Sequence, residues 1–230
     1  LHLNVTTETS HSLWDAESWN QGENGAALPS DESLATLPCF GGLDLSSTDD
    51  LTAFALVWAD RSGKMPQYFA RVCRHRDRKV PILSWAKYGY IDFSGRKRFN
   101  YDVIQDKILE LREKFRFREL AYDPHNAQSV ANSLEAAGVE CYSLAQTTAN
   151  FSEPVRLFGS ALHHGKMRHG SNPVLSWAFA GTQGQTDMQG HTRPVKVKST
   201  AKIDPIVSTL MAFARAILAP EKRPHPYAEE

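Results

Sequence analysis

A chain of 230 residues with 41% hydrophobic side chains is long enough for one domain with a substantial apolar core. Its 26 basic and 26 acidic residues cancel, so overall charge does not attract it to nucleic acid, and any phosphate contact must come from local basic clusters. The longest apolar stretch, 206–218, is interrupted by Arg215 and is too short to cross a bilayer.

The N-terminal segment, residues 1–38, is polar and carries Trp14 and Trp19 as isolated apolar anchors. We interpret it as a linker or docking arm. It begins with Leu and lacks a basic and apolar leader, so we expect a piece of a longer protein that is not exported. The three cysteines are scattered and odd in number, which favours reduced thiols over disulfides or a zinc site.

An apolar hairpin follows this segment. The pattern predicts strands at 39–46 and 51–59, joined by a turn at 47–50. A third strand at 67–73 completes an antiparallel meander. Residues 74–100 are irregular and basic, which is typical of a long functional loop.

One acid is out of place in the first strand. Asp44 lies between Leu43 and Leu45, where a carboxylate is disfavoured by strand propensity and costly to desolvate unless its charge is compensated. An Arg partner or backbone N–H donors could provide that compensation. We favour a functional carboxylate over these structural roles.

The rest of the chain alternates between helical and extended patterns. Apolar residues at steps of three and four predict an amphipathic helix at 101–115 and another at 203–217. Together the elements predict a mixed α/β sheet flanked by helices, with a flexible tail at 221–230. The other predicted elements are helices at 126–137, 152–165 and 172–180, strands at 118–123 and 139–144, and a short strand or extended segment at 194–198.

Three acids stand at comparable places in these elements. Asp44 lies in the first strand, Asp123 ends a later strand, and Asp204 begins the last helix. Asp123 and Asp204 each precede a proline, so helix capping explains them as well as function does. If the three converge, divalent cations would relieve their repulsion, and all-oxygen ligation suits Mg²⁺ or Mn²⁺. Two ions about 4 Å apart can activate water and stabilise the leaving oxygen in phosphodiester hydrolysis.

Five short motifs stand in order around these acids: GLDLS at 42–46, YDP at 122–124, GKMRH at 165–169, NPVLSW at 172–177 and KIDP at 202–205. In this order and spacing, which cover most of the chain, they resemble the nuclease domain of tailed-phage large terminase subunits. The resemblance implies an RNase H-like nuclease domain over residues 39–220.

The resemblance also implies metal-dependent, largely sequence-nonspecific cleavage of concatemeric double-stranded phage DNA during genome packaging. It assigns Asp44, Asp123 and Asp204 as catalytic ligands of Mg²⁺ or Mn²⁺, with two ions bound. The candidate assisting residues are Asp50, His125 and Lys202. Asp50 is explained equally well as a turn residue, and Lys202 as a phosphate contact or a counter-charge.

The implied partners are double-stranded DNA, the portal, the small terminase subunit and an ATPase domain, and the implied location is the host cytoplasm. These 230 residues contain no G-x-x-x-x-G-K-S/T loop, so ATP hydrolysis is not predicted for this chain.

Four basic clusters, at 71–79, 96–98, 163–169 and 196–202, favour a phosphate-bearing partner. From them we predict the DNA contacts Arg74, Arg76, Arg78, Lys79, Lys166, Arg168 and Lys198.

Other functions fit parts of the pattern. A resolvase or transposase of the same fold would use similar acids. A non-catalytic docking module would hold DNA or a protein partner through the basic clusters, while the acids cap helices. The hairpin also resembles the phosphate-binding hairpin of actin-like and sugar-kinase ATPases, but Ser46 stands where that loop needs glycine, and we discount this interpretation.

Overall fold

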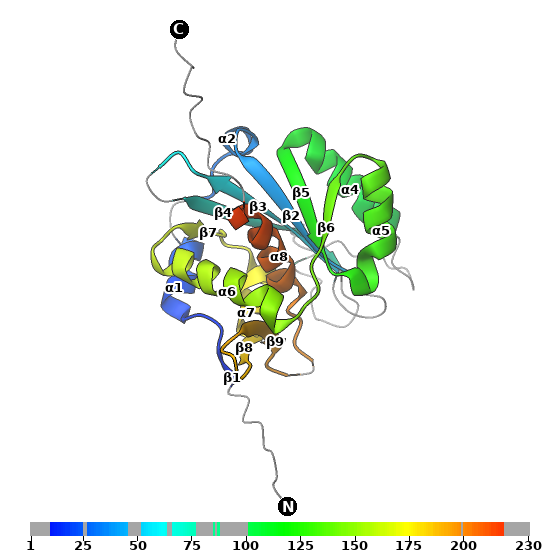
Figure 1. The fold of residues 1–230 in the computed structure, drawn as a ribbon. Coiled ribbons are helices and arrows are strands. Elements are labelled where there is room, and N and C mark those ends of the chain that lie inside the picture. Colours follow the sequence, from blue (N-terminus) through cyan, green and yellow to red (C-terminus); the bar gives the residue numbers. More distant parts are fainter. Residues whose placement is uncertain are drawn as a thin grey trace, which may run out of the picture.

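The structure is a computed structural model that describes residues 10–24, 27–45, 52–63, 66–76, 85, 87, 101–198 and 200–218. Within these residues the main sheet has six strands, and a separate small sheet has three, β1 (Ser10–Ser12), β8 (Thr182–Thr186) and β9 (Thr192–Lys196), in the order β1-β8-β9. Figure 1 shows the small sheet below the main one. In spatial order the main sheet contains β6 (Glu140–Ser143), β5 (Arg116–Tyr122), β2 (Pro38–Asp44), β3 (Thr52–Asp60), β4 (Gln67–Arg76) and β7 (Met167–Arg168).

The predicted meander is confirmed as β2, β3 and β4, which pair antiparallel in chain order. The first eight residues of β3 are all buried, as expected for a central strand covered on both faces. Next to β2, the strands β5 and β6 continue the sheet in parallel. The mixed antiparallel and parallel sheet expected from the sequence is therefore present.

Helices cover both faces of the main sheet (Figure 1). On one face α4 (Tyr101–Lys114) and α5 (Pro124–Ala136) pack over side chains such as Cys39 and Leu43. On the other face α8 (Asp204–Leu218) and α6 (Thr148–His163) pack over Phe40. In α8 every residue from 204 to 214 is buried, so this helix lies inside the domain.

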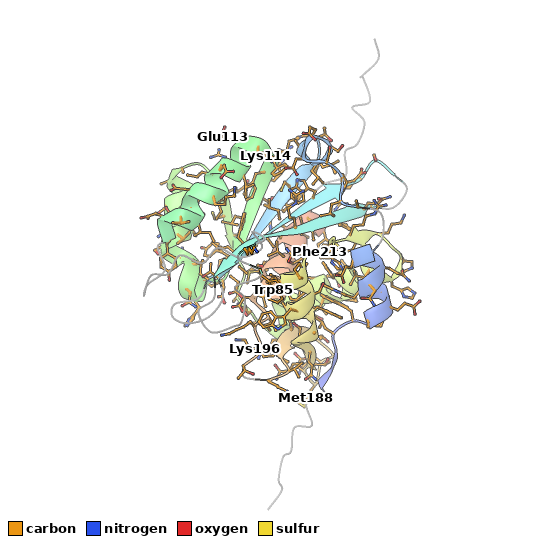
Figure 2. All side chains as sticks on the ribbon, turned by 180° about the vertical axis from the view of Figure 1, so that it is seen from behind. Trp85, Glu113, Lys114, Met188, Lys196 and Phe213 are labelled. Atoms are coloured by element: carbon orange, nitrogen blue, oxygen red, sulfur yellow. The ribbon has the colours of Figure 1, made fainter. Side chains whose placement is uncertain are left out.

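Figure 2 shows the contrast between the interior and the small sheet. Phe213 of α8 lies in the middle of the molecule and is fully buried, whereas Met188, in the turn after β8, is 85% exposed at the lower end. Within the part of the chain that the structure describes, no helix has the length and apolarity needed to span a membrane.

The described part of the predicted arm packs on the domain. It forms β1, α1 (Ala16–Asn24) and α2 (Asp31–Ala35). The Trp14 indole N–H donates to the carbonyl of Val155 at 3.0 Å, and Trp19 stacks on Phe179 with ring centroids 4.1 Å apart. The described part of this segment thus packs against α6 and α7 (Pro173–Ala180). Residues 221–230, the predicted tail, lie outside the described residues.

Helix α6 starts earlier than predicted. We expected Ser152 and Pro154 to open it, but Thr147 is the N-cap, and its Oγ1 accepts the backbone N–H of Asn150 at 3.2 Å. Pro154 instead lies inside the helix, where its missing N–H costs one backbone hydrogen bond. The first strand is also shorter than predicted, since β2 ends at Asp44.

The small sheet was largely missed from the sequence. Only β9 was expected, as a short strand or extended segment at 194–198, and α7 (Pro173–Ala180) matches the predicted helix before it. Strand β8 has the sequence TQGQT and shows no alternation of apolar and polar residues. It forms because β1 and β9 pair with it on either side.

Two cysteine side chains are described. Cys39 is buried and Cys141 is half-buried, and both carry thiols. Burial raises the pKa of the Cys141 thiol to about 12, so this side chain is a poor nucleophile at neutral pH.

Acid is expected to destabilise the fold through His169. This side chain is 1% exposed, its ring stacks on Trp19, and burial lowers its pKa to about 4 from the ordinary 6.5. Between these two pH values the unfolded chain binds a proton that the folded chain excludes, so stability is complete above about pH 6.5 and falls as pH drops toward 4. From pH 7.5 to 5 we expect a loss of about 2 kcal/mol in the free energy of unfolding.

Urea unfolding at pH 7.5 and pH 5 measures this loss. In the control variant His169→Phe, which keeps an aromatic ring against Trp19 but cannot titrate, the loss should shrink to what other groups contribute. An equal loss in both proteins would show that His169 is not its source.

Candidate functional site

Asp44 and Asp123 lie side by side at one edge of the main sheet. Asp44 is the last residue of β2, and Asp123 directly follows β5, the parallel neighbour of β2. Leu43 is in register with Tyr122, and the Asp123 N–H donates to the Leu43 carbonyl at 3.4 Å. Because both strands run in the same direction, both carboxylates emerge at their carboxyl ends. Asp44 is 9% exposed and Asp123 is half-buried.

A glutamine that the sequence analysis missed connects the two acids. Gln146 follows β6, the third parallel strand that ends at this edge. Its Nε2 donates to Asp44 Oδ1 at 3.2 Å and to Asp123 Oδ2 at 2.8 Å. The signal that could have found it is positional, since a polar residue shortly after a parallel strand reaches the same edge as the acids.

Asp123 has a structural role as well. It is the N-cap of α5, and its Oδ1 accepts the backbone N–H of His125 at 3.1 Å. The capping interpretation is therefore confirmed for this residue. Its second carboxylate oxygen is the one that faces Gln146, so capping leaves that oxygen directed into the site.

Helix α8 runs antiparallel to β2. Near its C-terminal end, Arg215 Nε donates to Glu119 Oε2 of β5 at 2.6 Å. The Ala216 carbonyl accepts a hydrogen bond from Arg61, which directly follows β3. These contacts place the C-terminal end of α8 far from Asp44 and its N-terminal end near it.

The same packing of α8 on β2 determines where Asp204 lies along the direction of β2. Gly42 of β2 packs directly against the backbone of Ser208 in α8. From Ser208 back to Asp204 the helix rises about 6 Å, and from Gly42 to Asp44 the strand advances about 6.6 Å. Asp204 is 9% exposed and begins α8 at the same end of the sheet as Asp44.

Within the described ranges, no group of three or more His, Cys, Asp or Glu side chains is arranged so that it could hold a metal ion. The structure thus joins Asp44 and Asp123 through Gln146 and puts Asp204 at the same end, without gathering all three acids in one such group. The donor types still fit the expected metal, because carboxylate and amide oxygens are the ligands that Mg²⁺ and Mn²⁺ prefer.

The candidate assisting residues stand near these acids where they are described. His125 is exposed in the first turn of α5, and Lys202 is half-buried two residues before Asp204. Asp50 lies outside the described residues.

The predicted DNA contacts fall in different places. Arg76 is in register with Thr52 at the Asp44 end of β4, and Arg74 precedes it by two residues. Arg168 belongs to β7, which pairs with the opposite end of β4 beside Lys166, roughly 20 Å away along the strand. Lys198 is exposed just after β9, whereas Arg78 and Lys79 lie outside the described residues.

Arg193 is a second residue that the sequence analysis missed. It lies in β9, donates from Nε to Gln185 Oε1 at 2.9 Å and from Nη1 to the Gln146 carbonyl at 3.0 Å. The small sheet therefore contacts the segment that carries Gln146. Sequence patterning did not single out Arg193, because its contact depends on how the two sheets pack.

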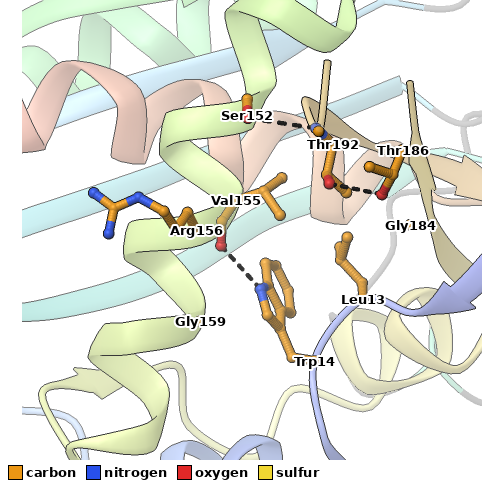
Figure 3. A pocket seen from close by; sticks show the side chains of 10 residues that line it. Leu13, Trp14, Ser152, Val155, Arg156, Gly159, Gly184, Thr186 and Thr192 are labelled. Carbon is orange, nitrogen blue, oxygen red and sulfur yellow. Dashed lines mark hydrogen bonds between the residues drawn. The ribbon is translucent and has the colours of Figure 1, made fainter. Parts of the chain in front are cut away.

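A pocket of about 340 Å³ opens elsewhere, between the arm, α6 and the small sheet (Figure 3). Trp14, Val155 and Arg156 line it, and the bond from the Trp14 indole to the Val155 carbonyl forms part of its wall. None of its lining residues is one of the predicted site residues. The pocket is thus separate from the acidic edge, the end of the main sheet that carries Asp44 and Asp123.

Comparison with known proteins gives a consistent result. The family model for the terminase large subunit, endonuclease domain, matches residues 1–220. Protein YmfN of Escherichia coli (strain K12) is 22% identical over 235 residues, which cover 94% of this chain and 51% of that protein.

Solved structures of phage large terminases resemble the fold. The crystal structure of the HK97 bacteriophage large terminase has a TM-score of 0.75 at 21% identity, covering 91% of this chain and 44% of that one. The large terminase nuclease from thermophilic phage G20c, with bound magnesium, has a TM-score of 0.53 at 10% identity, covering 78% of this chain and 82% of that one. The fold is thus RNase H-like, and the chain spans about half the length of YmfN and of the HK97 protein.

Proposed function

The chain belongs to the family of terminase large subunit endonuclease domains, and from this premise we propose that it is a divalent-metal-dependent endonuclease that cleaves double-stranded phage DNA concatemers during genome packaging. The observation that carries this proposal is the pair Asp44 and Asp123, held side by side by Gln146 at the carboxyl edge of the sheet. The G20c nuclease with bound magnesium supports the choice of metal.

Each proposed metal ligand is held by its own element. Asp44 is fixed by β2, Asp123 by its capping of α5, and Asp204 by the buried first turn of α8. We propose that these three carboxylates hold two Mg²⁺ or Mn²⁺ ions. When bound, such ions activate a water and stabilise the leaving oxygen of a phosphodiester. The protein supplies fixed oxygens and a partly buried site in which their charge is weakly screened.

Double-stranded DNA is the proposed substrate. We place it across the acidic edge. Arg74 and Arg76 lie in the last three residues of β4 at this end of the sheet, and Lys198 follows β9. Lys166 and Arg168 would contact only DNA that extends along the sheet. The portal, the small terminase subunit and an ATPase domain are proposed partners, and the host cytoplasm is the proposed location.

Nicking of supercoiled plasmid tests this proposal. The wild-type chain should nick DNA with Mn²⁺ or Mg²⁺ and stop when EDTA is added. Asp123→Asn and Asp204→Asn should each slow nicking by at least about 10²-fold, because each removes negative charge that holds the cations. DNA binding, measured by fluorescence anisotropy, should remain or strengthen, since a negative charge near the phosphates is gone.

Asp106→Asn is the matched control, because Asp106 is an exposed acid of α4 on the other face of the sheet. It should leave nicking unchanged. Metal-independent DNA binding without any nicking would instead support the non-catalytic docking module. Cleavage restricted to branched DNA would support a resolvase-type activity.

A further inference from the structure

Gln146 is held by its backbone, while its side chain spans the site. Its carbonyl accepts from Arg193 at 3.0 Å. On either side, the Leu144 N–H donates to the Tyr122 carbonyl at 2.8 Å, and Thr147 caps α6. These contacts fix the segment between β6 and α6. The side-chain torsions of Gln146 are the remaining degree of freedom.

The amide of Gln146 is matched to two carboxylates. An amide NH₂ has two N–H groups, and here one points to Asp44 and the other to Asp123. Each bond to a charged acceptor is worth more than a bond between neutral groups. In the absence of a cation, this nitrogen therefore offsets the repulsion between the two acids.

The same nitrogen is incompatible with a cation between the acids, because it is a donor without a lone pair to offer. Half a turn of the amide about its last torsion would exchange Nε2 for Oε1. An amide oxygen is a normal ligand for Mg²⁺ or Mn²⁺. One side chain can thus satisfy this pair of acids in both states.

Gln146 is positioned to be such a ligand. Asp204, the third proposed ligand, does not form one metal-binding group with Asp44 and Asp123 within the described residues. The amide of Gln146, by contrast, already touches both carboxylates.

We propose that Gln146 is a switchable metal-site residue: its Nε2 bridges Asp44 and Asp123 when no cation is bound, and its Oε1 becomes a ligand when a divalent cation takes that place. This inference rests on the metal use proposed above. It adds a ligand that the motifs around the three acids do not contain.

Mn²⁺ titration by calorimetry, without DNA, tests the inference on the 230-residue chain. Gln146→Glu keeps an oxygen but loses both N–H groups. It should melt at a lower temperature than wild type without metal and bind Mn²⁺ about 10-fold more tightly. Gln146→Met keeps the length but offers no hard oxygen, and should bind Mn²⁺ about 10-fold more weakly.

Gln189→Met is the matched control, since Gln189 is exposed in the turn between β8 and β9. It should bind Mn²⁺ as wild type does. If wild type binds Mn²⁺ in an Asp44-dependent manner but both Gln146 variants bind it equally well, Gln146 is a structural link only and the inference is wrong. If wild type and Asp44→Asn bind Mn²⁺ identically, the metal proposal itself fails, and the inference falls with it.

Discussion

Asp44→Asn is expected to abolish metal-dependent nicking, with a rate loss of about 10²–10³-fold or more, while the protein stays folded. Asn has the same shape, and its Oδ1 can still accept the Gln146 N–H, so the edge of the sheet should keep its packing. What is lost is a negative charge in a nearly buried position, where its attraction for a cation is strong. Plasmid nicking at fixed Mn²⁺, with circular dichroism as the check on folding, measures the effect.

The matched control for this variant is Asp60→Asn. Asp60 ends β3 at the opposite end of the meander, where its Oδ1 accepts from the backbone and hydroxyl of Ser62. Its replacement should weaken a turn slightly and leave nicking intact. Equal nicking by wild type and Asp44→Asn would remove Asp44 from the site and leave the docking module as the better explanation of the acids.

Gly42→Ala should destabilise the domain by more than about 3 kcal/mol, the largest stability change expected here. A Cβ at Gly42 would lie 1.9 Å from the Ser208 carbonyl oxygen and 2.6 Å from the Ala212 nitrogen, both backbone atoms of α8. Neither can move unless the whole helix shifts away from β2. Because α8 carries Asp204, such a shift should also reduce nicking at temperatures where the variant is still folded.

Gly41→Ala is the comparison that isolates this cause. Its Cβ would meet the ring of Phe117 at 2.7 Å and a methyl of Leu120 at 2.8 Å, which are ends of side chains and can rotate aside in part. Chemical denaturation of the two variants should give a clearly smaller loss for Gly41→Ala. If the losses are equal, the close approach of α8 is not what requires glycine at position 42.

Several parts of the fold were predictable because local pattern and tertiary environment agree. The meander follows from three apolar runs separated by turns, and α4 follows from its spacing of apolar residues. The start of α6 was wrong because Ser152 and Pro154 form a plausible cap, while the actual cap, Thr147, is also a good one. Local chemistry does not choose between two adequate caps.

The pairing of the small sheet was beyond the reach of the sequence. β1 and β8 are short and polar, so no hydrophobic period marks them, and each forms only where a partner strand supplies hydrogen bonds. The role of Arg193 could not be predicted for the same reason. Its contact with Gln146 exists only because this sheet packs beside the end of β6.

By itself the sequence determined which acid was out of place. Asp44 interrupts an apolar strand, and the cost of burying a carboxylate makes that visible without coordinates. It also determined the layered α/β architecture and the family resemblance. Tertiary structure alone decided which groups share the edge, because residues 44, 123 and 146 meet only through the parallel register of β2, β5 and β6. Register is a property of paired strands, and no single stretch of sequence contains it.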